Sequence, residues 1–169
     1  MRTNFSISEL RQVLIDLSVE SCSSVYGAFS GGLESHVLLH ALSCRAADYP
    51  FSLHAIHINH SLHPESSEWA NHCQAVCDDL GMPLIVKTIT VNADKGGSLE
   101  AAARDARYTA LAEALPENGI CITAQHINDQ TETILLQLLR GAGVHGLAAM
   151  PASKNFAQGR LLRPLLGHS

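Results

Sequence analysis

The fold of this chain is decided by a short stretch in which an apolar run meets a pair of glycines: Val25-Tyr26-Gly27-Ala28-Phe29-Ser30-Gly31-Gly32-Leu33-Glu34-Ser35. Residues 25–29 have the character of a buried strand, and an apolar-rich helix is predicted from Leu33 to Ala46. Glycines adopt backbone angles that other residues resist, and a helix start offers unpaired N–H groups with a partial positive charge. The unit therefore predicts a phosphate-binding turn. The alternative is a plain Gly-Gly turn before an ordinary helix.

Outward from this unit, strands and helices alternate along the chain. Further strands are predicted at Phe51–Asn59, Leu84–Ile89, Ile120–Ala124 and, with a weaker pattern, Arg160–Leu162. Further helices are predicted at residues 8–20, from Pro64 at the first helical position to a stop at Gly81, at Leu99–Leu115 and at Asp129–Arg140. This alternation predicts one α/β domain over residues 1–169, a doubly wound parallel sheet of about five strands with helices on both faces.

The predicted sheet brings distant loops together. Ligands of doubly wound sheets bind beyond the carboxyl ends of the strands. Residues 30–35, 57–64 and 124–130 follow predicted strands and are therefore expected on one rim.

Composition limits the partners and the compartment. The formal net charge is −5, whereas a nucleic-acid-binding domain usually carries a basic surplus. Any RNA-binding surface must therefore be local or lie on a segment outside this chain. No long apolar run and no secretory signal occur, so a cytoplasmic protein is expected. The five cysteines are odd in number and irregularly spaced, so a disulfide framework is not expected. Cys73 and Cys77 stand four apart, and they are expected to be buried or half-buried structural thiols, the alternative being a metal site.

The glycine loop closely resembles the pyrophosphate-binding loop of the N-type ATP pyrophosphatases, the PP-loop superfamily, whose pattern is Ser-Gly-Gly-x-Asp-Ser. Further strings narrow the resemblance to the N-terminal domain of the tRNA(Ile)-lysidine synthetases. These strings are His57-Ile58-Asn59-His60-Ser61-Leu62, residues 100–108, residues 123–133, residues 139–147 and Arg163-Pro164-Leu165-Leu166. They follow the family's order between residues 25 and 166.

The resemblance implies a ligase of tRNA modification that uses ATP and Mg²⁺. Such enzymes adenylylate the C2 oxygen of a cytidine in the CAU anticodon of tRNA(Ile), and the amine of free lysine then displaces AMP to form lysidine. The resemblance also implies a homodimer as one state of the protein. The family's C-terminal tRNA-binding domains are expected to be absent from residues 1–169.

The resemblance also assigns residues to ATP and Mg²⁺. The pyrophosphate is expected on the loop residues Ser30, Gly31, Gly32, Leu33, Glu34 and Ser35, and the adenine against Ala28 and Ile56, with His57 and His126 framing the nucleotide. Glu34 and Asp129 are the expected Mg²⁺ ligands.

Two pairs of charged residues complete the expected catalytic set with Glu34. Asp129 and Glu132 stand three apart and can hold the ammonium of lysine and take its proton, the alternative being solvated acids at a helix start. Arg104 and Arg107 also stand three apart. A guanidinium fork suits the charged oxygens of ATP or of a tRNA phosphate, the alternative being ordinary surface arginines.

One position departs from the family pattern, because Glu34 stands where the family has aspartate. Glutamate keeps the charge on an arm one methylene longer, and Mg²⁺ demands near-ideal geometry. A weakened enzyme and a retuned or inactive one both remain open.

Three other functions also remain open: a nucleotide-binding module without turnover, a tRNA-thiolation enzyme, and a universal-stress-like nucleotide-binding protein. Thiolation usually needs cysteines at the site, and the last class lacks the pair of Asp129 and Glu132. The single tryptophan, Trp69, is expected to pack between a helix and the sheet, and His60 and His63 are expected to be ordinary loop residues.

Overall fold

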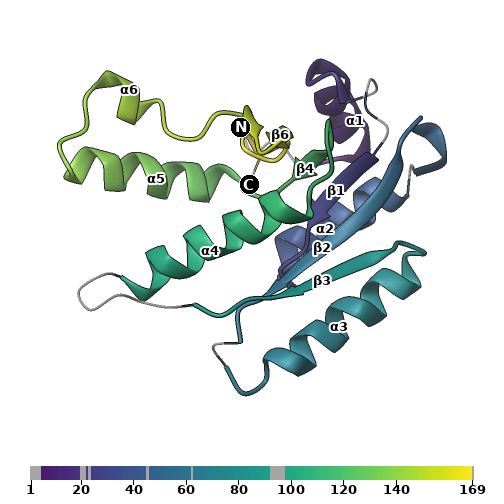
Figure 1. The fold of residues 1–169 in the computed structure, drawn as a ribbon. Coiled ribbons are helices and arrows are strands. Elements are labelled where there is room, and N and C mark those ends of the chain that lie inside the picture. The colour runs from purple at the N-terminus through teal and green to yellow at the C-terminus, as the bar shows by residue number, and fades with distance from the viewer. Residues whose placement is uncertain are drawn as a thin grey trace.

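The computed structural model describes residues 5–19, 22, 24–44, 46–61, 63–91 and 98–168. These residues form one sheet whose strands are β1 (Ser24–Ala28), β2 (Ser52–Asn59), β3 (Leu84–Thr88), β4 (Ile120–Ile122), β5 (Ser153–Phe156) and β6 (Gly159–Leu162). The helices are α1 (Ile7–Asp16), α2 (Leu33–Ser43), α3 (Ser66–Asp79), α4 (Leu99–Ala114), α5 (Ile127–Leu139) and α6 (Val144–Leu147), with a 3₁₀ helix at Ala46–Asp48. Figure 1 shows their arrangement.

The sheet has the strand order β3-β2-β1-β4-β6-β5. All neighbours pair in parallel except β5, which pairs antiparallel with β6 at the edge. The order turns at β1, because the chain first builds outward to β2 and β3 and then continues on the other side with β4. Ligands of such sheets bind at this switch point, beyond the carboxyl ends of β1 and β4.

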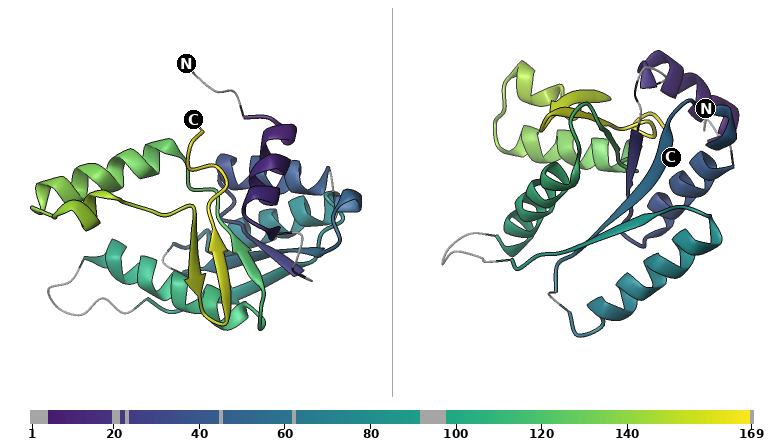
Figure 2. Two further views of the ribbon diagram at one scale, coloured as in Figure 1. Left: turned by 90° about the horizontal axis from the view of Figure 1, so that it is seen from above. Right: turned by 45° about the vertical axis from the view of Figure 1, so that its right-hand side comes forward.

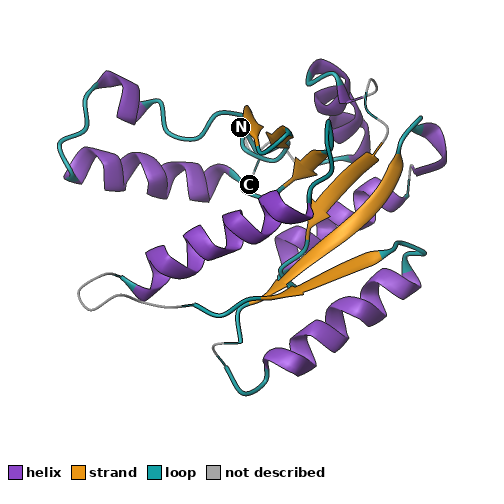
Figure 3. Ribbon diagram, in the orientation of Figure 1, coloured by secondary structure: helices purple, strands orange, loops and turns teal. Residues whose placement is uncertain are grey.

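Helices cover both faces of the sheet, and Figure 3 shows them around the strands. One core joins α1 and α2 to β1 and β4 through Leu10, Leu14, Leu38, Leu42 and Val25, among others. A second core joins α4 to the opposite face through Leu111, Ile56 and Cys121. A third joins α3 to the first face through Cys73, Cys77 and Leu39. Alternate residues of β1 therefore enter different cores, as strand geometry requires.

The arm formed by α5 and α6 projects away from the sheet in both views of Figure 2. None of the residues of α5 is buried, and none of those of α6. The arm is tied back at its base, where the Gln130 side chain donates to the Met150 carbonyl and accepts from the Met150 N–H, both at 3.0 Å.

The fold class predicted from the sequence is confirmed, with local differences. The sheet has six strands among the described residues rather than about five, because the short antiparallel strand β5 was not expected. Its sequence, Ser-Lys-Asn-Phe, carries little apolar signal because the strand lies at an edge and has no buried residue. The short helix α6 was also not expected.

Four predicted helix boundaries are wrong. Helix α1 ends at Asp16 rather than at residue 20, and helix α5 begins at Ile127 rather than at Asp129. Helix α3 begins at Ser66 rather than at Pro64, because Pro64 and Glu65 form a turn first. Helix α2 ends at Ser43, and Ala46 belongs to the following 3₁₀ helix. Within the described residues, no helix is both long and apolar enough to cross a membrane.

Candidate nucleotide-binding site

A cleft of about 820 Å³ opens at the carboxyl ends of β1, β2 and β4. Its walls come from the glycine loop, the start of α2, the loop after β2, helix α4 and the start of α5. Eleven residues assigned from the sequence line it: Ala28, Ser30, Glu34, Ser35, Ile56, His57, Arg104, Arg107, His126, Asp129 and Glu132. The three predicted rim loops therefore do meet at one site. Gly31, Gly32 and Leu33 belong to the same loop but are not among the lining residues.

The glycine loop is held closed by its own serines. The buried Ser35 hydroxyl donates to the Gly32 carbonyl at 2.9 Å and lies 3.1 Å from the Ser30 hydroxyl. The Ser30 N–H donates to the Ser35 oxygen at 3.3 Å, and the Gly32 N–H donates to the Ser30 oxygen at 3.3 Å. Gly31 has a φ of 85°, in the left-handed region that glycine enters without strain. The sequence therefore builds a tight turn directly before the first N–H groups of α2, which is an anion-binding arrangement.

A buried histidine supports the loop from behind. His57 at the end of β2 donates from Nδ1 to the Phe29 carbonyl at 2.8 Å, so its Nε2 is an acceptor when the ring is neutral. The Cys73 sulfur of α3 lies 3.4 Å from the same nitrogen. A Cβ on Gly31 would stand 3.3 Å from that sulfur. The loop, β2 and α3 are therefore in direct contact.

The start of α5 carries the predicted acid pair. The Asp129 Oδ2 accepts from the His126 N–H at 2.8 Å and lies 2.5 Å from His126 Nδ1. This carboxylate caps the helix and orients the imidazole through one of its two oxygens. Glu132 is exposed one turn later and also lines the cleft. Of the pair, Asp129 is therefore the carboxylate that hydrogen-bonds within the protein, and Glu132 is the one more accessible to a ligand.

The predicted Mg²⁺ ligands suit that ion by their chemistry. Among the described residues, no group of three or more His, Cys, Asp or Glu side chains is arranged to enclose a metal. Nucleotide-bound Mg²⁺ does not need such a cage, because one or two carboxylates act together with phosphate oxygens. Glu34 and Asp129 line the same cleft, and both bonds from Asp129 to His126 use Oδ2.

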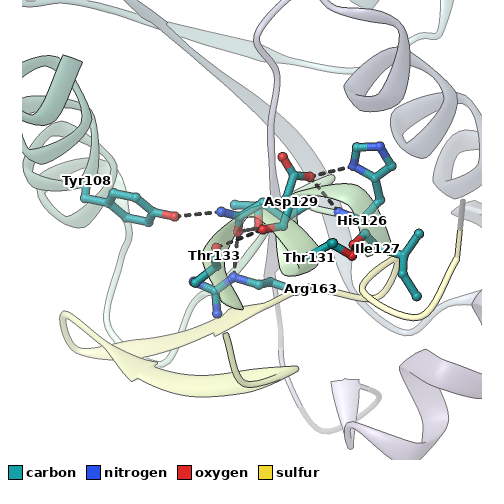
Figure 4. A network of polar contacts seen from close by, with 9 residues as sticks. Tyr108, His126, Ile127, Asp129, Thr131, Thr133 and Arg163 are labelled. Carbon is teal, nitrogen blue, oxygen red and sulfur yellow. Dashed lines mark hydrogen bonds and ion pairs between the residues drawn. The ribbon is translucent and has the colours of Figure 1, made fainter. Parts of the chain in front are cut away.

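A polar network that the sequence reasoning did not identify as a unit reaches the cleft through Tyr108, Thr123 and Gln125 (Figure 4). Arg163, only 3% exposed, donates from Nε to the Gln125 side-chain oxygen at 2.5 Å and from a terminal nitrogen to the Pro151 carbonyl at 2.9 Å. The Thr123 hydroxyl donates to the same Gln125 oxygen at 3.0 Å. The Gln125 amide nitrogen then donates to the Tyr108 hydroxyl at 3.3 Å.

This network changes the acidity of Tyr108. Burial alone raises the pKa of its hydroxyl, but the hydrogen bond and charge of Arg163, the Gln125 hydrogen bond and the charge of Arg107 outweigh burial. The pKa of Tyr108 therefore lies below its usual value. Tyr108 and Gln125 both stand inside strings that carry the family resemblance, and that position was the only sequence signal for them.

Two further lining residues differ from their sequence interpretation. Trp69 was expected to pack between a helix and the sheet, but it is 50% exposed and stacks on His63 with ring centroids 5.1 Å apart. Trp69 shares a helix face with the buried Cys73 and Cys77, but it stands in the first turn of α3, where it lines the cleft. His60 was taken as an ordinary loop residue, yet it lines the cleft, and burial followed by the charges of Arg107 and His57 lowers its pKa.

All five cysteines are free, and none lines the cleft in the described part of the chain, although Cys73 contacts His57 and the glycine loop. Cys73 and Cys77 are buried, as expected, whereas Cys44 is exposed. Burial raises the pKa of Cys73 and Cys77 to about 11 and that of Cys121 to about 12. These are inert structural thiols rather than nucleophiles.

The chain is similar to proteins of known name. It is 54% identical over 144 residues to the tRNA(Ile)-lysidine synthase of Pseudomonas aeruginosa, which covers 84% of this chain and 32% of that protein. The corresponding enzyme of Coxiella burnetii is 51% identical over 139 residues, covering 82% and 31%. That of Salmonella schwarzengrund is 47% identical over 153 residues, covering 90% and 35%. The chain thus spans about a third of the length of these curated relatives.

A solved structure has the same fold at much lower sequence identity. The U34-tRNA thiolase NcsA of Methanococcus maripaludis, solved with its [4Fe–4S] cluster, superposes with a TM-score of 0.72. The two share 16% identity over 94% of this chain and 56% of that one. A comparison with family profiles matches residues 3–169 to the PP-loop domain. With the closed Ser-Gly-Gly loop at the switch point of the sheet, this match makes the chain a member of the PP-loop family of ATP-binding domains.

Proposed function

We propose that this chain is the adenylylating domain of a ligase that makes lysidine in tRNA(Ile). The observation that carries the proposal is a single cleft in which the glycine loop, the acid pair on α5 and the arginine pair on α4 meet. The relatives at 46–54% identity, named tRNA(Ile)-lysidine synthases, support the same assignment. Because ATP and tRNA are used there, the proposal includes the cytoplasm as the compartment.

The first step is attack of the cytidine C2 oxygen on the α-phosphorus of ATP. The bond from phosphorus to the bridging oxygen breaks, and pyrophosphate leaves with its electron pair. Negative charge grows on the bridging oxygen and on the pyrophosphate. The N–H groups at the start of α2 are fixed by the serine bonds of the loop, so they stabilise that charge without reorganising. Arg104 and Arg107 line the cleft from helix α4, and they are proposed to stabilise charged oxygens of the reactants.

Mg²⁺ would be held by Glu34 and Asp129 together with phosphate oxygens. When bound, the ion neutralises charge on the phosphates as pyrophosphate leaves. Glu34 is exposed at the start of α2, so its longer side chain has room to adjust its position. The substitution for aspartate is therefore proposed to retune the site rather than to abolish it.

The second step is attack of the ε-amine of lysine on C2 of the adenylylated base. A C–N bond forms, the C–O bond breaks and AMP leaves. Lysine arrives as an ammonium ion and must lose a proton before attack. Glu132 is proposed to hold the ammonium and accept that proton, because Asp129 already shares one oxygen with His126. Asp129 and His126 together are proposed to orient the site.

The surface of α5 supports a homodimer as a further part of the proposal. Ile134, Leu135, Leu138 and Leu139 are all exposed on this helix. Contiguous exposed apolar side chains of this kind mark interaction sites. A second copy of the chain is the proposed occupant.

One assay tests the proposed function. The protein is mixed with ATP, Mg²⁺, lysine and tRNA(Ile) bearing the CAU anticodon, and both pyrophosphate release and lysine incorporation into RNA are measured. Release that depends on this tRNA, with incorporation that depends on ATP, is the expected result. The same tRNA with a GAU anticodon is the matched control.

Variants sharpen the assay. Glu132→Gln is expected to abolish lysine incorporation while leaving much of the pyrophosphate release. Glu34→Asp run beside the unmodified chain shows whether position 34 limits the rate. Tight ATP binding with no release from either protein would overturn the proposal for this chain.

A further inference from the structure

The polar network behind the cleft fixes the direction of its hydrogen bonds. Arginine has donors only, so the Nε of Arg163 requires the Gln125 oxygen to face it at 2.5 Å. The Thr123 hydroxyl donates to the same oxygen. The Gln125 amide group therefore cannot be turned around, and its NH₂ must face the Tyr108 hydroxyl at 3.3 Å (Figure 4). The Tyr108 oxygen is thus an acceptor of that bond.

The Tyr108 oxygen accepts the hydrogen bond from Gln125, so the proton of the Tyr108 hydroxyl remains available for a second hydrogen bond. Tyr108 lines the cleft, so the acceptor of this proton is an atom that enters the cleft. The surrounding positive charge favours a negative oxygen as that acceptor, because a charge-assisted hydrogen bond is stronger than a neutral one.

Three cations surround the same ring. The guanidinium carbons of Arg104 and Arg107 lie 5.8 and 5.7 Å from the centroid of the Tyr108 ring, and the Lys154 ammonium lies 5.3 Å from it. Among the described residues, no carboxylate lies within 4.0 Å of the charged nitrogens of these three side chains. Cation–π contact with one ring offsets only part of the repulsion among three like charges. An anion on this cluster would balance it.

The cluster extends beyond the part of the cleft that ATP is proposed to occupy. Arg104, Arg107 and Tyr108 line the cleft, whereas Lys154 comes from the edge strand β5 and does not. The triphosphate has its own site on the glycine loop at the start of α2. A ligand that contacts the whole cluster must therefore carry phosphate both inside the cleft and at its outer edge, as a polynucleotide strand does.

We propose that Tyr108, Arg104, Arg107 and Lys154 form a subsite for the backbone phosphates of the RNA strand whose base enters the cleft. This inference rests on the proposed function, and it deepens it by naming a surface of this domain that holds the RNA. Lys154 holds the outer phosphate, and the Tyr108 hydroxyl donates to a non-bridging oxygen of the inner one. This local basic surface lies on a chain whose formal net charge is −5.

The test measures RNA and ATP binding separately. A fluorescent stem-loop RNA with a CAU anticodon and a fluorescent ATP analogue are titrated against the chain and three variants at several salt concentrations. Lys154→Gln is expected to weaken RNA binding about fivefold and to reduce the salt dependence by about one phosphate contact, with ATP affinity unchanged. Arg11→Gln removes the same charge from α1, on the other face of the sheet, and is expected to leave both affinities as they are.

Tyr108→Phe gives an independent signature. It keeps the ring, and so the cation contacts, but removes the donor. RNA affinity is expected to fall about tenfold to a hundredfold, the effect of one hydrogen bond to a charged oxygen, with the salt dependence unchanged. Thermal unfolding of each variant checks that the fold is retained.

The outcomes separate this inference from the proposed function. Equal losses for Lys154→Gln and Arg11→Gln overturn the subsite, because they would reflect net charge alone. A parallel loss of ATP affinity overturns it as well, since the phosphate would then be that of ATP. RNA binding too weak to detect in the unmodified chain has the same consequence. If Lys154→Gln weakens RNA binding but the unmodified chain releases no pyrophosphate with tRNA, the proposed function fails and the subsite stands.

Discussion

Helices α2 and α5 both leave the same rim of the sheet, each directly after a strand, yet they are packed in opposite ways. Helix α2 buries Ser35, Leu38, Leu39, Ala41 and Leu42, whereas α5 buries no residue at all. Both are rich in leucine. The glycine loop is therefore followed by a helix that is anchored in the core. The acid pair instead lies at the start of a helix whose apolar side chains remain exposed.

The largest expected effect comes from shortening one leucine in each helix. Leu42 is 0% exposed and Leu139 is 83% exposed. Leu42→Ala is expected to lower the free energy of unfolding by about 2–5 kcal/mol, because it leaves a cavity in the core. Leu139→Ala is expected to change it by less than about 0.5 kcal/mol. Urea unfolding of both variants measures this. Equal destabilisation would mean that α5 is packed after all.

The next effect concerns ATP and uses two glycines with the same backbone conformation. Gly31 has a φ of 85° and Gly141, after α5, has a φ of 70°. An L-residue in this region costs about 1–2 kcal/mol. Gly31→Ala should weaken ATP binding by about tenfold or more, since the strained loop must hold the phosphates. Gly141→Ala should lower stability by a similar free energy and leave ATP affinity unchanged. Calorimetric titration with ATP decides between them, and equal losses of affinity would remove the loop from the site.

A third test addresses the proposed second copy on α5. Leu138→Glu places a charge on the exposed apolar surface and is expected to shift a dimer to monomer in sedimentation velocity, with the far-UV circular dichroism spectrum unchanged. Glu113→Gln, a charge change at an exposed position of α4, is the control. A monomeric unmodified chain at all concentrations would overturn the proposed second copy on α5.

The smallest effect concerns pH, and of the two helices compared it falls on the α2 side, in addition to the contribution of Cys121 in the core under α4. The thiols of Cys73 and Cys77 pack against Phe29 and Leu39, and burial raises their pKa values to about 11. Unfolded thiols ionise near 9, so the unfolded state loses protons first as the pH rises. The stability from these groups is present below about pH 9 and is lost as the pH approaches 11. Urea unfolding at pH 8 and pH 10 measures the loss.

A matched pair of substitutions checks the cause of that pH dependence. Cys77→Ala is expected to reduce the difference in free energy of unfolding between the two pH values, whatever its effect at pH 8. Cys44→Ala, at an exposed position after α2, is expected to leave the difference as it is. An unchanged difference in Cys77→Ala would assign the alkaline effect to other groups.

The sequence predicts those regions whose structure and role depend on residues that are close together in the chain. The glycine loop, the alternation of strands and helices and the acids at the start of α5 are all local signals, and the structure brings them to one rim. Edge elements were missed because a strand such as β5, paired on one side and buried nowhere, needs no apolar pattern. The network of Tyr108, Gln125 and Arg163 was missed because its members lie 17 and 38 residues apart, so their contact exists only in the folded chain.

Because Cys73 contacts the glycine loop, the reactivity of its thiol reports on motion of that loop. The sulfur is buried, and a Cβ on Gly31 would stand 3.3 Å from it. An alkylating reagent can therefore reach this thiol only when the loop and α3 separate. The rate of Cys73 modification then measures how often that opening occurs. A nucleotide that holds the loop in place must slow the modification. Occupancy of the nucleotide site can therefore be followed by mass spectrometry of Cys73 alkylation, without a label on the nucleotide.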